Sequence, residues 1–444
     1  MITAAFFVAF WLACSTLAVT RHPIFGLYLY FAATYVHPPS RWWGELLPDL
    51  RWSLLAAAVT AAAILIYKDS PPERPPWIAN VPAAIFTSYT AWMWIQSLWA
   101  LDRETHLQGC VQFVKYLLAF WMIYRVVDSK DRVRTLLFLH AAGCGLLGVY
   151  ARYTERVGGR LDGVGGPGID DANTLGMYLA TGVIACAGLI LTQTGWRRYV
   201  VFGLLAFTVN GFVLANSRGS LLGLAAGGVV FVLLKAREHG RLFWLLAFLA
   251  LPAAAVVVDQ VFIDRMFSIR SAVEQGEDMD DSARSRLELK KAQVQMFLDH
   301  PMGAGFRGTE TLSPRYLDRR WLSSDESGNR DDNSARSSHN TFLTTLVEQG
   351  LLGALMFCAL LGWLVVTCVR IRSWSKSKVD SALTTFAAAL CGGLTIVYVA
   401  GLATDYLLAE VQFWFFAGLV VVIRLAGSQV KALGPGPAPL GFVR

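Results

Sequence analysis

His339 is the residue of this sequence best placed to do chemistry. It ends the polar segment 259–339 and directly precedes an apolar run that begins at Thr341. An imidazole titrates near neutrality and can take a proton from a hydroxyl group, so a general base is one interpretation. A histidine that only caps a helix at a membrane interface is the other, and position alone leaves both open. Asn340 is a good N-cap for the following helix.

Two arginines are candidates for binding an anion beside this histidine. Arg218 stands alone between two apolar runs, where an arginine usually faces a cavity or a partner, although a snorkelling side chain is the alternative. Arg286 begins an amphipathic stretch; an exposed salt bridge is its alternative, and more so that of Arg284, which lies nearer the acidic run 278–281. Two guanidinium groups can grip a pyrophosphate bidentately. With His339 as base, they predict glycosyl transfer with pyrophosphate as the leaving group.

Other polar residues are candidates for substrate contacts. The glycine-dense loop 158–168 has amides that can form an anion-binding nest, although a plain hinge or re-entrant loop fits equally well. The expected substrate-binding residues are Arg160, Arg307, Arg336, Ser338 and Asn340.

Three polar residues, Asp170, Asp171 and Asn173, follow the glycine-dense loop. They can hold a metal ion or cap the next helix, and capping is the interpretation that we favour. No metal is expected among the site residues.

The composition predicts that a membrane surrounds these residues. Of 444 residues, 55% are hydrophobic and 16% are charged, whereas soluble domains have about 25% charged residues. The net charge of +7 is explained by basic cytoplasmic loops, so no nucleic acid partner is expected. The seven cysteines form no CxxC pair, which favours small core residues over a metal site or disulfides.

Long apolar runs predict an all-α, polytopic integral membrane protein with about twelve or thirteen transmembrane helices and one large, partly helical loop. The expected spans are 2–20, 24–37, 52–67, 77–101, 110–127, 134–151, 173–194, 199–216, 219–235, 242–258, 340–369, 380–402 and 406–425. Thirteen spans place the termini on opposite sides. If one of the short runs 24–37 and 52–67 only half inserts, twelve spans leave both termini inside.

Basic residues gather in every second connector between these spans. Because basic loops stay in the cytoplasm, this alternation puts the polar segment 259–339 and His339 on the non-cytoplasmic face. The domains expected are an N-terminal bundle (1–258), the polar loop carrying part of the active site (259–339), C-terminal transmembrane helices (340–428) and a flexible cytoplasmic tail (429–444).

The polar segment contains one clear helical pattern. Residues 285–298 carry Leu287, Val294 and Leu298 with lysines between them, which predicts an amphipathic helix. His300-Pro301 is expected to end this helix, and the glycines of 302–306 predict a turn.

The sequence resembles the O-antigen ligase and O-antigen polymerase family of multi-pass membrane glycosyltransferases. The resemblance is carried by Ser338-His339-Asn340 with Glu348, Gly350 and Gly353, by the turn 301–306, by the corner Ser217-Arg218-Gly219 and by Arg286.

The resemblance implies an activity and a location. Such ligases join a glycan carried on undecaprenyl pyrophosphate to a lipid A–core oligosaccharide, at the periplasmic face of the bacterial inner membrane, without ATP, a metal or another cofactor. Membrane lipids surround the protein. By resemblance, His339 is the base for the acceptor hydroxyl, Arg218 and Arg286 contact the pyrophosphate, and direct attack inverts the anomeric centre.

Three alternatives remain open. A polymerase extends one lipid-linked glycan with another, and a protein O-oligosaccharyltransferase uses a serine or threonine acceptor. A lipid-glycan transporter is disfavoured because the polar groups collect at one face and spans such as 221–234 contain no charge.

Overall fold

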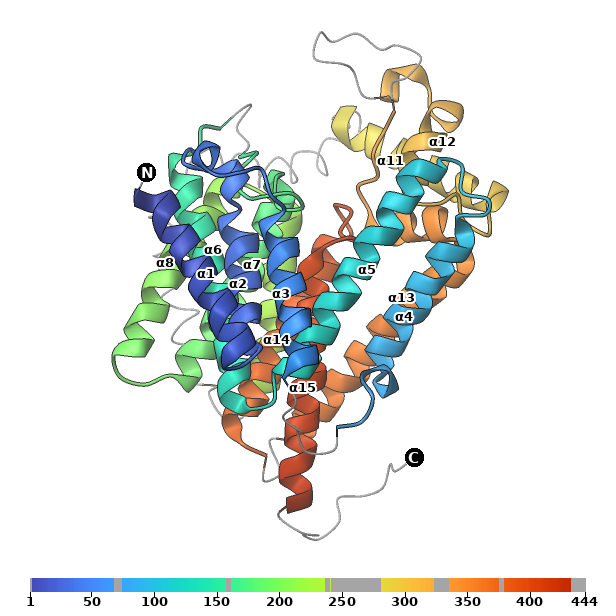
Figure 1. The fold of residues 1–444 in the computed structure, drawn as a ribbon. Helices are drawn as coiled ribbons and strands as arrows, with labels where there is room; N and C mark the ends of the chain where they lie inside the picture. The colour runs from blue at the N-terminus through green and yellow to red at the C-terminus, as the bar shows by residue number, and fades with distance from the viewer. Residues whose placement is uncertain are drawn as a thin grey trace.

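A computed structural model of the protein describes residues 2–67, 74–156, 161–235, 240, 281–322, 335–374 and 379–432 (Figure 1). The side chains of residues 281–283, 286, 431 and 432 also lie outside the description. The expected tail beyond residue 432 and Arg160 therefore cannot be placed in the fold.

Within the described residues the regular structure is helical, with turns and irregular links between the helices and no strand. The helices of the first half are α1 (Ile2–Thr20), α2 (Ile24–Val36), α3 (Trp52–Ile66), α4 (Val81–Gln96), α5 (Arg103–Val126), α6 (Lys130–Tyr153), α7 (Ala172–Thr192), α8 (Trp196–Ala215) and the helix Arg218–Lys235. Those of the second half are α11 (Asp281–Asp299), α12 (Gly308–Tyr316), α13 (Thr341–Trp374), α14 (Ser381–Ala400) and α15 (Glu410–Ala432). Short 3-10 helices occur at Pro38–Ser40, Gly44–Leu46, Trp77–Ala79 and Arg319–Trp321.

Each expected membrane span except 242–258, which lies outside the described residues, corresponds to one of these helices. Within the description, eight helices are long and apolar enough to cross a bilayer by length and composition. The all-α polytopic prediction is confirmed. The short runs 24–37 and 52–67 form complete helices, α2 and α3, that pack against each other.

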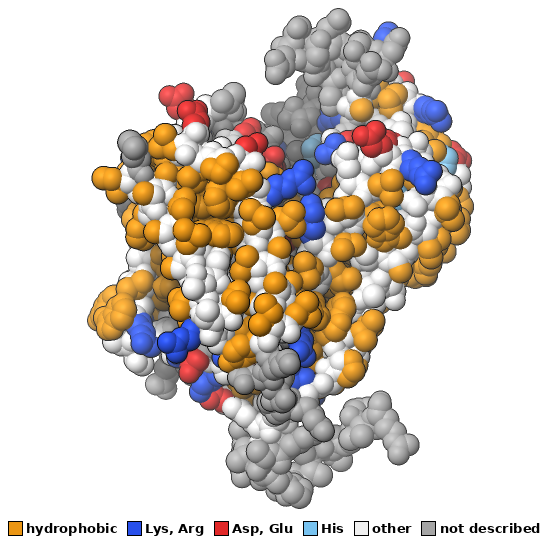
Figure 2. Space-filling view, in the orientation of Figure 1, with side chains coloured by type: hydrophobic (Ala, Val, Ile, Leu, Met, Phe, Trp, Pro, Cys, Tyr) orange, Lys and Arg blue, Asp and Glu red, His pale blue; other side chains and the backbone are white. Residues whose placement is uncertain are grey.

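The centre of the bundle is made by α7, α14 and α15, most of whose side chains are buried. Trp414 of α15 is fully enclosed, with its ring centroid 4.5 Å from that of Phe31 and 6.4 Å from that of Tyr178. In contrast, α1, α8 and α13 lie at the edge and expose large apolar side chains. Hydrophobic side chains cover the middle of the face drawn in Figure 2, and most charged ones lie toward its two ends.

The cysteines follow this division between centre and edge. The prediction of core residues holds for the buried Cys14, Cys110, Cys144, Cys186 and Cys391. It is wrong for Cys358, which is exposed, and only partly right for Cys368, because both lie on the peripheral helix α13.

The connectors sort into two ends as the charge pattern predicted. At the basic end, the Lys130 ammonium lies 2.6 Å from the Asp380 carboxylate, so the starts of α6 and α14 meet. At the other end, the Leu101 amide donates to the Ala304 carbonyl. This second end carries α11 and α12 and is called the polar-loop end below (Figure 1). The start of α1 lies toward the polar-loop end and α15 runs to the basic end, so these two helix ends lie at opposite ends of the bundle (Figure 1).

A break in α13 anchors the polar segment to the bundle. Gly350 has φ 65° and ψ −169°, which interrupts the helix. The turn 301–306 fills the gap: the Ala304 and Gly305 amides donate to the Val347 and Glu348 carbonyls at 2.9 Å, and the Leu351 amide donates to the Pro301 carbonyl. The predicted turn is confirmed, and its glycines are explained by close packing against α13. A Cβ at Gly303 would lie 2.6 Å from the Glu348 carbonyl oxygen.

The helix predicted over residues 285–298 exists, but its buried face was predicted wrongly. Leu287, Val294 and Leu298 are exposed, whereas Leu289 and Met296 pack with Val347 of α13. The prediction rested on the alternation of apolar residues with lysines. The break in α13 instead fixes α11 so that the face containing Leu289, Ala292 and Met296 is covered.

Candidate functional site

The start of α13 is held by Asn340, as predicted. Its side-chain Oδ1 accepts hydrogen bonds from the Phe342 and Leu343 amides, both at 3.0 Å, which satisfies two open donors of the helix. Its Nδ2 donates to the Leu402 carbonyl at 3.1 Å. Asn340 therefore has a structural role in which both its side-chain oxygen and its side-chain nitrogen form hydrogen bonds.

Ser338 fixes the backbone on the other side of His339. The Ser338 hydroxyl oxygen accepts from Gln293 Nε2 at 2.9 Å and from the Asn340 amide at 3.2 Å. Both chain neighbours of His339 are thus tied to other elements, Ser338 to α11 and Asn340 to the 401–409 loop.

His339 lines a cavity of about 110 Å³ at the polar-loop end. Leu289, Lys290 and Gln293 of α11 form one wall, and Leu402 with Ala403 form the opposite one. The cavity combines an imidazole, an ammonium and a carboxamide, and it is open to solvent on one side. This arrangement can accept a proton and bind a negatively charged or hydroxyl-bearing group.

Gln293 is the residue in this cavity that the sequence prediction missed. Its side chain is 1% exposed, and Nε2 is used by Ser338, but Oε1 has no hydrogen-bond partner in the described structure. A buried acceptor without a donor is costly, so a ligand hydroxyl at this place would be favourable. The signal was present in the sequence, because Gln293 lies at i+4 from Leu289, on a stripe that is otherwise apolar.

Lys290 was also missed as a site residue. It lies in the wall of the cavity, one helical turn after position 286. Residues four apart share a helix face, so the register of α11 brings position 286 toward the same side. The side chain of Arg286 itself lies outside the description.

The corner that carries Arg218 is built on Asn173 at the start of α7. The Ser217 hydroxyl donates to Asn173 Oδ1 and the Ser220 hydroxyl donates to the Asn173 carbonyl, both at 3.1 Å. Ser217 also caps the helix Arg218–Lys235 by accepting from the Ser220 amide. Asp171 accepts from the Asn173 and Thr174 amides, so the predicted capping of α7 is confirmed for Asp171, while Asn173 joins two helices.

The 401–409 loop links the Arg218 corner to the start of α13. Tyr406 donates its hydroxyl proton to the Asn173 carbonyl at 2.9 Å and its amide proton to Thr341 Oγ1 at 2.8 Å. A Cβ added at Gly219 would lie 3.0 Å from Ala403 Cβ, and Ala403 lines the His339 cavity. The structure therefore brings the backbone of Arg218 and the imidazole of His339 to the two sides of one short loop.

The same loop carries an unusual carboxyl group. Burial raises the pKa of Asp405 to about 6, although part of the side chain remains accessible. A hydrogen bond from the Leu407 amide, at 3.0 Å, works against this rise, and the nearby Glu310 carboxylate adds to it. The site thus has Lys290 on the α11 side and, in the 401–409 loop, a carboxyl group whose pKa is raised.

Arg307 and Arg336, two of the remaining predicted contacts, are not among the residues that line the cavity. The Arg336 guanidinium donates to the Ser285 hydroxyl at 3.1 Å and to the Trp321 carbonyl at 3.3 Å. These bonds attach the segment before His339 to α11. Arg307 has a side chain that is 60% exposed and lies 3.8 Å from the Glu310 carboxylate. Arg160 lies outside the described residues.

One comparison with known proteins gives a match. Residues 202–358 match the family model described as O-antigen ligase (Wzy_C). The matched range runs from α8 into α13 and includes Arg218, α11, the turn 301–306 and His339, but not Leu402 and Ala403 of the cavity. No curated protein matches the chain.

Proposed function

We propose that this chain, a member of the O-antigen ligase family by its match over residues 202–358, transfers a glycan from undecaprenyl pyrophosphate to a hydroxyl of a lipid A–core oligosaccharide. The reaction is a membrane glycosyl transfer that inverts the anomeric centre. The one observation that carries the proposal is the cavity in which His339 faces Lys290 and Gln293, across a short loop from the Arg218 corner.

His339 acts as the general base in this proposal. The imidazole takes the proton of the acceptor hydroxyl while the hydroxyl oxygen attacks the anomeric carbon. A new glycosidic C–O bond forms, the C–O bond to the pyrophosphate breaks, and its electron pair leaves with the pyrophosphate. The proton then passes from the imidazole to solvent.

Arginine and lysine side chains stabilise the leaving group. Arg218 and Arg286 grip the pyrophosphate, and Lys290 adds a third cation from the cavity wall. The buried Gln293 Oε1 accepts a hydrogen bond from a sugar hydroxyl and so orients the acceptor. Each of these roles needs only residues of this chain.

The proposed setting is the bacterial inner membrane, with the His339 cavity at the periplasmic face. Its support is the alternation of basic connectors along the sequence, with the basic link 128–134 at the opposite end of the bundle. Cysteine labelling tests this in a background without the seven native cysteines. A membrane-impermeant maleimide should label Arg320→Cys in intact spheroplasts, and Arg370→Cys only after permeabilisation. The reverse pattern would contradict the orientation.

A polymerase and a protein O-oligosaccharyltransferase share the donor and differ in the acceptor. Purified protein should be given undecaprenyl-pyrophosphate glycan with one of three acceptors: lipid A–core, a second lipid-linked glycan, or a serine- and threonine-containing peptide. We expect product only with lipid A–core. Product with the second glycan or the peptide instead would assign the alternative activity. A donor that carries the glycan on undecaprenyl monophosphate is the control, because it lacks the pyrophosphate leaving group.

A further inference from the structure

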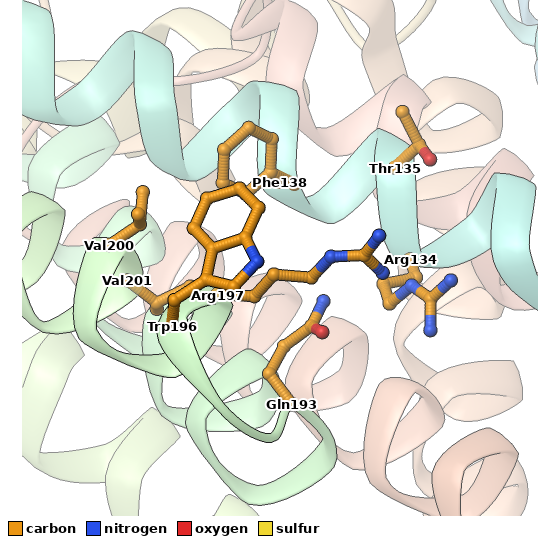
Figure 3. Close-up of a pocket in the computed structure, with 8 residues that line it drawn as sticks. All are labelled: Arg134, Thr135, Phe138, Gln193, Trp196, Arg197, Val200 and Val201. Carbon is orange, nitrogen blue, oxygen red and sulfur yellow. The ribbon is translucent and has the colours of Figure 1, made fainter.

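A second, larger cavity lies at the basic end of the bundle, far from His339. It has a volume of about 370 Å³ and opens between the first turns of α6, the short α7–α8 link and the start of α8 (Figure 3). Nothing in the proposed transfer reaction uses this end of the molecule. A cavity of this size is within the range of small-ligand sites.

One half of the cavity is polar and basic. The guanidinium groups of Arg134 and Arg197 and the carboxamide of Gln193 point toward a common space in Figure 3. No described lining residue carries a carboxylate. The Arg134 guanidinium lies 2.7 Å from Asp131, but the Asp131 side chain is 71% exposed. An exposed ion pair of this kind is weak, so it leaves Arg134 able to bind a stronger anion.

The start of α8 adds to the basic character of this half. Its N-cap is Gly195, which provides no side-chain hydrogen bond to the open amides of the first turn. Such amides favour an anion because of the helix dipole. Arg197 lies in this first turn, so the dipole and the guanidinium act on the same space.

The other half of the cavity is apolar. It is formed by Trp196, Phe138 and Val200, and the Trp196 side chain is 72% exposed. Farther along α8, Phe202 and Phe207 are also exposed, as expected for a face that contacts acyl chains. Tryptophan is typical of the level at which lipid headgroups meet the acyl region.

We propose that this cavity binds the headgroup of an anionic phospholipid. The phosphodiester lies between Arg134 and Arg197, with Gln193 as a further hydrogen-bond donor, and the glycerol and upper acyl carbons pack on Trp196, Phe138 and Val200. A basic pocket between membrane helices that continues into an apolar surface matches both parts of such a lipid. A soluble phosphate ester would match only the basic half.

The test measures lipid binding by native mass spectrometry and by thermal unfolding in detergent. Phosphatidylglycerol should bind and raise the unfolding temperature, while phosphatidylcholine should do so weakly. The double variant Arg134→Gln/Arg197→Gln should bind phosphatidylglycerol about thirtyfold more weakly, since each basic group near the membrane surface contributes to anionic lipid binding.

The matched control is Arg125→Gln/Arg370→Gln, which removes two exposed charges from the same end but outside the cavity. It should bind phosphatidylglycerol like the original protein. If both double variants bound phosphatidylglycerol equally weakly, net charge alone would explain the loss, and the proposal would be overturned.

Inorganic phosphate and glycerol 3-phosphate form the second arm of the test. If either stabilises the protein as much as phosphatidylglycerol, the site belongs to a soluble anion and the lipid assignment is wrong. The single variant Arg197→Gln provides an independent measurement, because this exposed side chain is not needed for packing. Its unchanged affinity for phosphatidylglycerol would also overturn the proposal.

Discussion

Two places in α13 connect this helix to other segments, and we call them joints: the filled joint at Gly350 and the open joint at the start of the helix. At Gly350 the helix is interrupted and the gap is filled completely, since a Cβ there would lie 2.5 Å from the Pro301 carbonyl oxygen. At its start the helix is capped by Asn340, and a cavity is left beside His339. Both positions lie within the range 202–358 that matches the O-antigen ligase family model. The filled joint at Gly350 therefore serves packing, whereas the open joint leaves space for a substrate beside His339.

The largest effect is expected at the open joint. Replacing His339 with alanine should lower the transfer rate about a thousandfold, because a general base contributes between a hundredfold and ten-thousandfold. The unfolding temperature in detergent should stay the same. Initial rates with saturating donor and acceptor measure this, with His300→Ala as the control at the end of α11. Undiminished transfer would remove His339 from the mechanism.

The opposite outcome is expected at the filled joint. Gly350→Ala places a side chain at φ 65°, against the backbone of the turn, and should destabilise the protein by about 3 kcal/mol. The folded fraction should keep its rate per molecule. Gly362→Ala is the control on the same helix, since its Cβ would meet nothing within 4 Å. A Gly350→Ala protein that is stable but inactive would erase the distinction between the joints.

Gln293 sharpens the comparison, because it borders the cavity without being the base. Gln293→Met keeps the volume and removes both the buried acceptor Oε1 and the hydrogen bond from Nε2 to Ser338, so kcat/KM for the acceptor should fall about tenfold. The rate at saturating acceptor should change less. Gln295→Met, on the exposed face of α11, is the matched control. Equal kinetics in both variants would assign Gln293 a packing role only.

The smallest effect expected is on the pH dependence of stability, through Asp405 in the 401–409 loop. Its folded-state pKa of about 6 is above the ordinary value of 3.8, so the neutral carboxyl stabilises the fold. This stabilisation is fully present below the ordinary pKa and is lost as pH rises through about 6. Between pH 5 and 7 the unfolding temperature should fall by on the order of 2 °C more in the original protein than in Asp405→Asn.

Asp318→Asn, at a well-exposed aspartate, should leave this pH dependence as it is. Other titratable groups of the protein also contribute to the pH dependence, so Asp405→Asn should reduce the slope without abolishing it. An unchanged slope in Asp405→Asn would contradict the assigned burial of this carboxyl.

Sequence patterns predicted the features that depend on neighbours along the chain. Apolar runs gave the helices, alternating basic connectors gave the two ends, and Asn340 and Asp171 were identified as caps. Such signals are local, because a helix and its cap are set by residues a few positions apart. The pairing of His339 with the Arg218 corner came from residue chemistry and family resemblance.

The features that escaped prediction depend on contacts between distant segments. The buried face of α11 follows from the way that the turn 301–306 enters α13, which joins residues about fifty positions apart. Gln293 faces the cavity for the same reason. The role of the 401–409 loop depends on the Tyr406 bond to Asn173, and no periodicity in either segment indicates it.

The two hydrogen-bonded neighbours of His339 have a consequence for the entropy of the reaction. Ser338 is tied to Gln293, and Asn340 is tied to Leu402 and to its own helix. The backbone of His339 therefore loses its conformational freedom once, when the protein folds, and not again in each catalytic cycle. Binding energy from a long lipid-linked substrate is then left for aligning the two sugars, whose many rotatable bonds are the larger source of disorder.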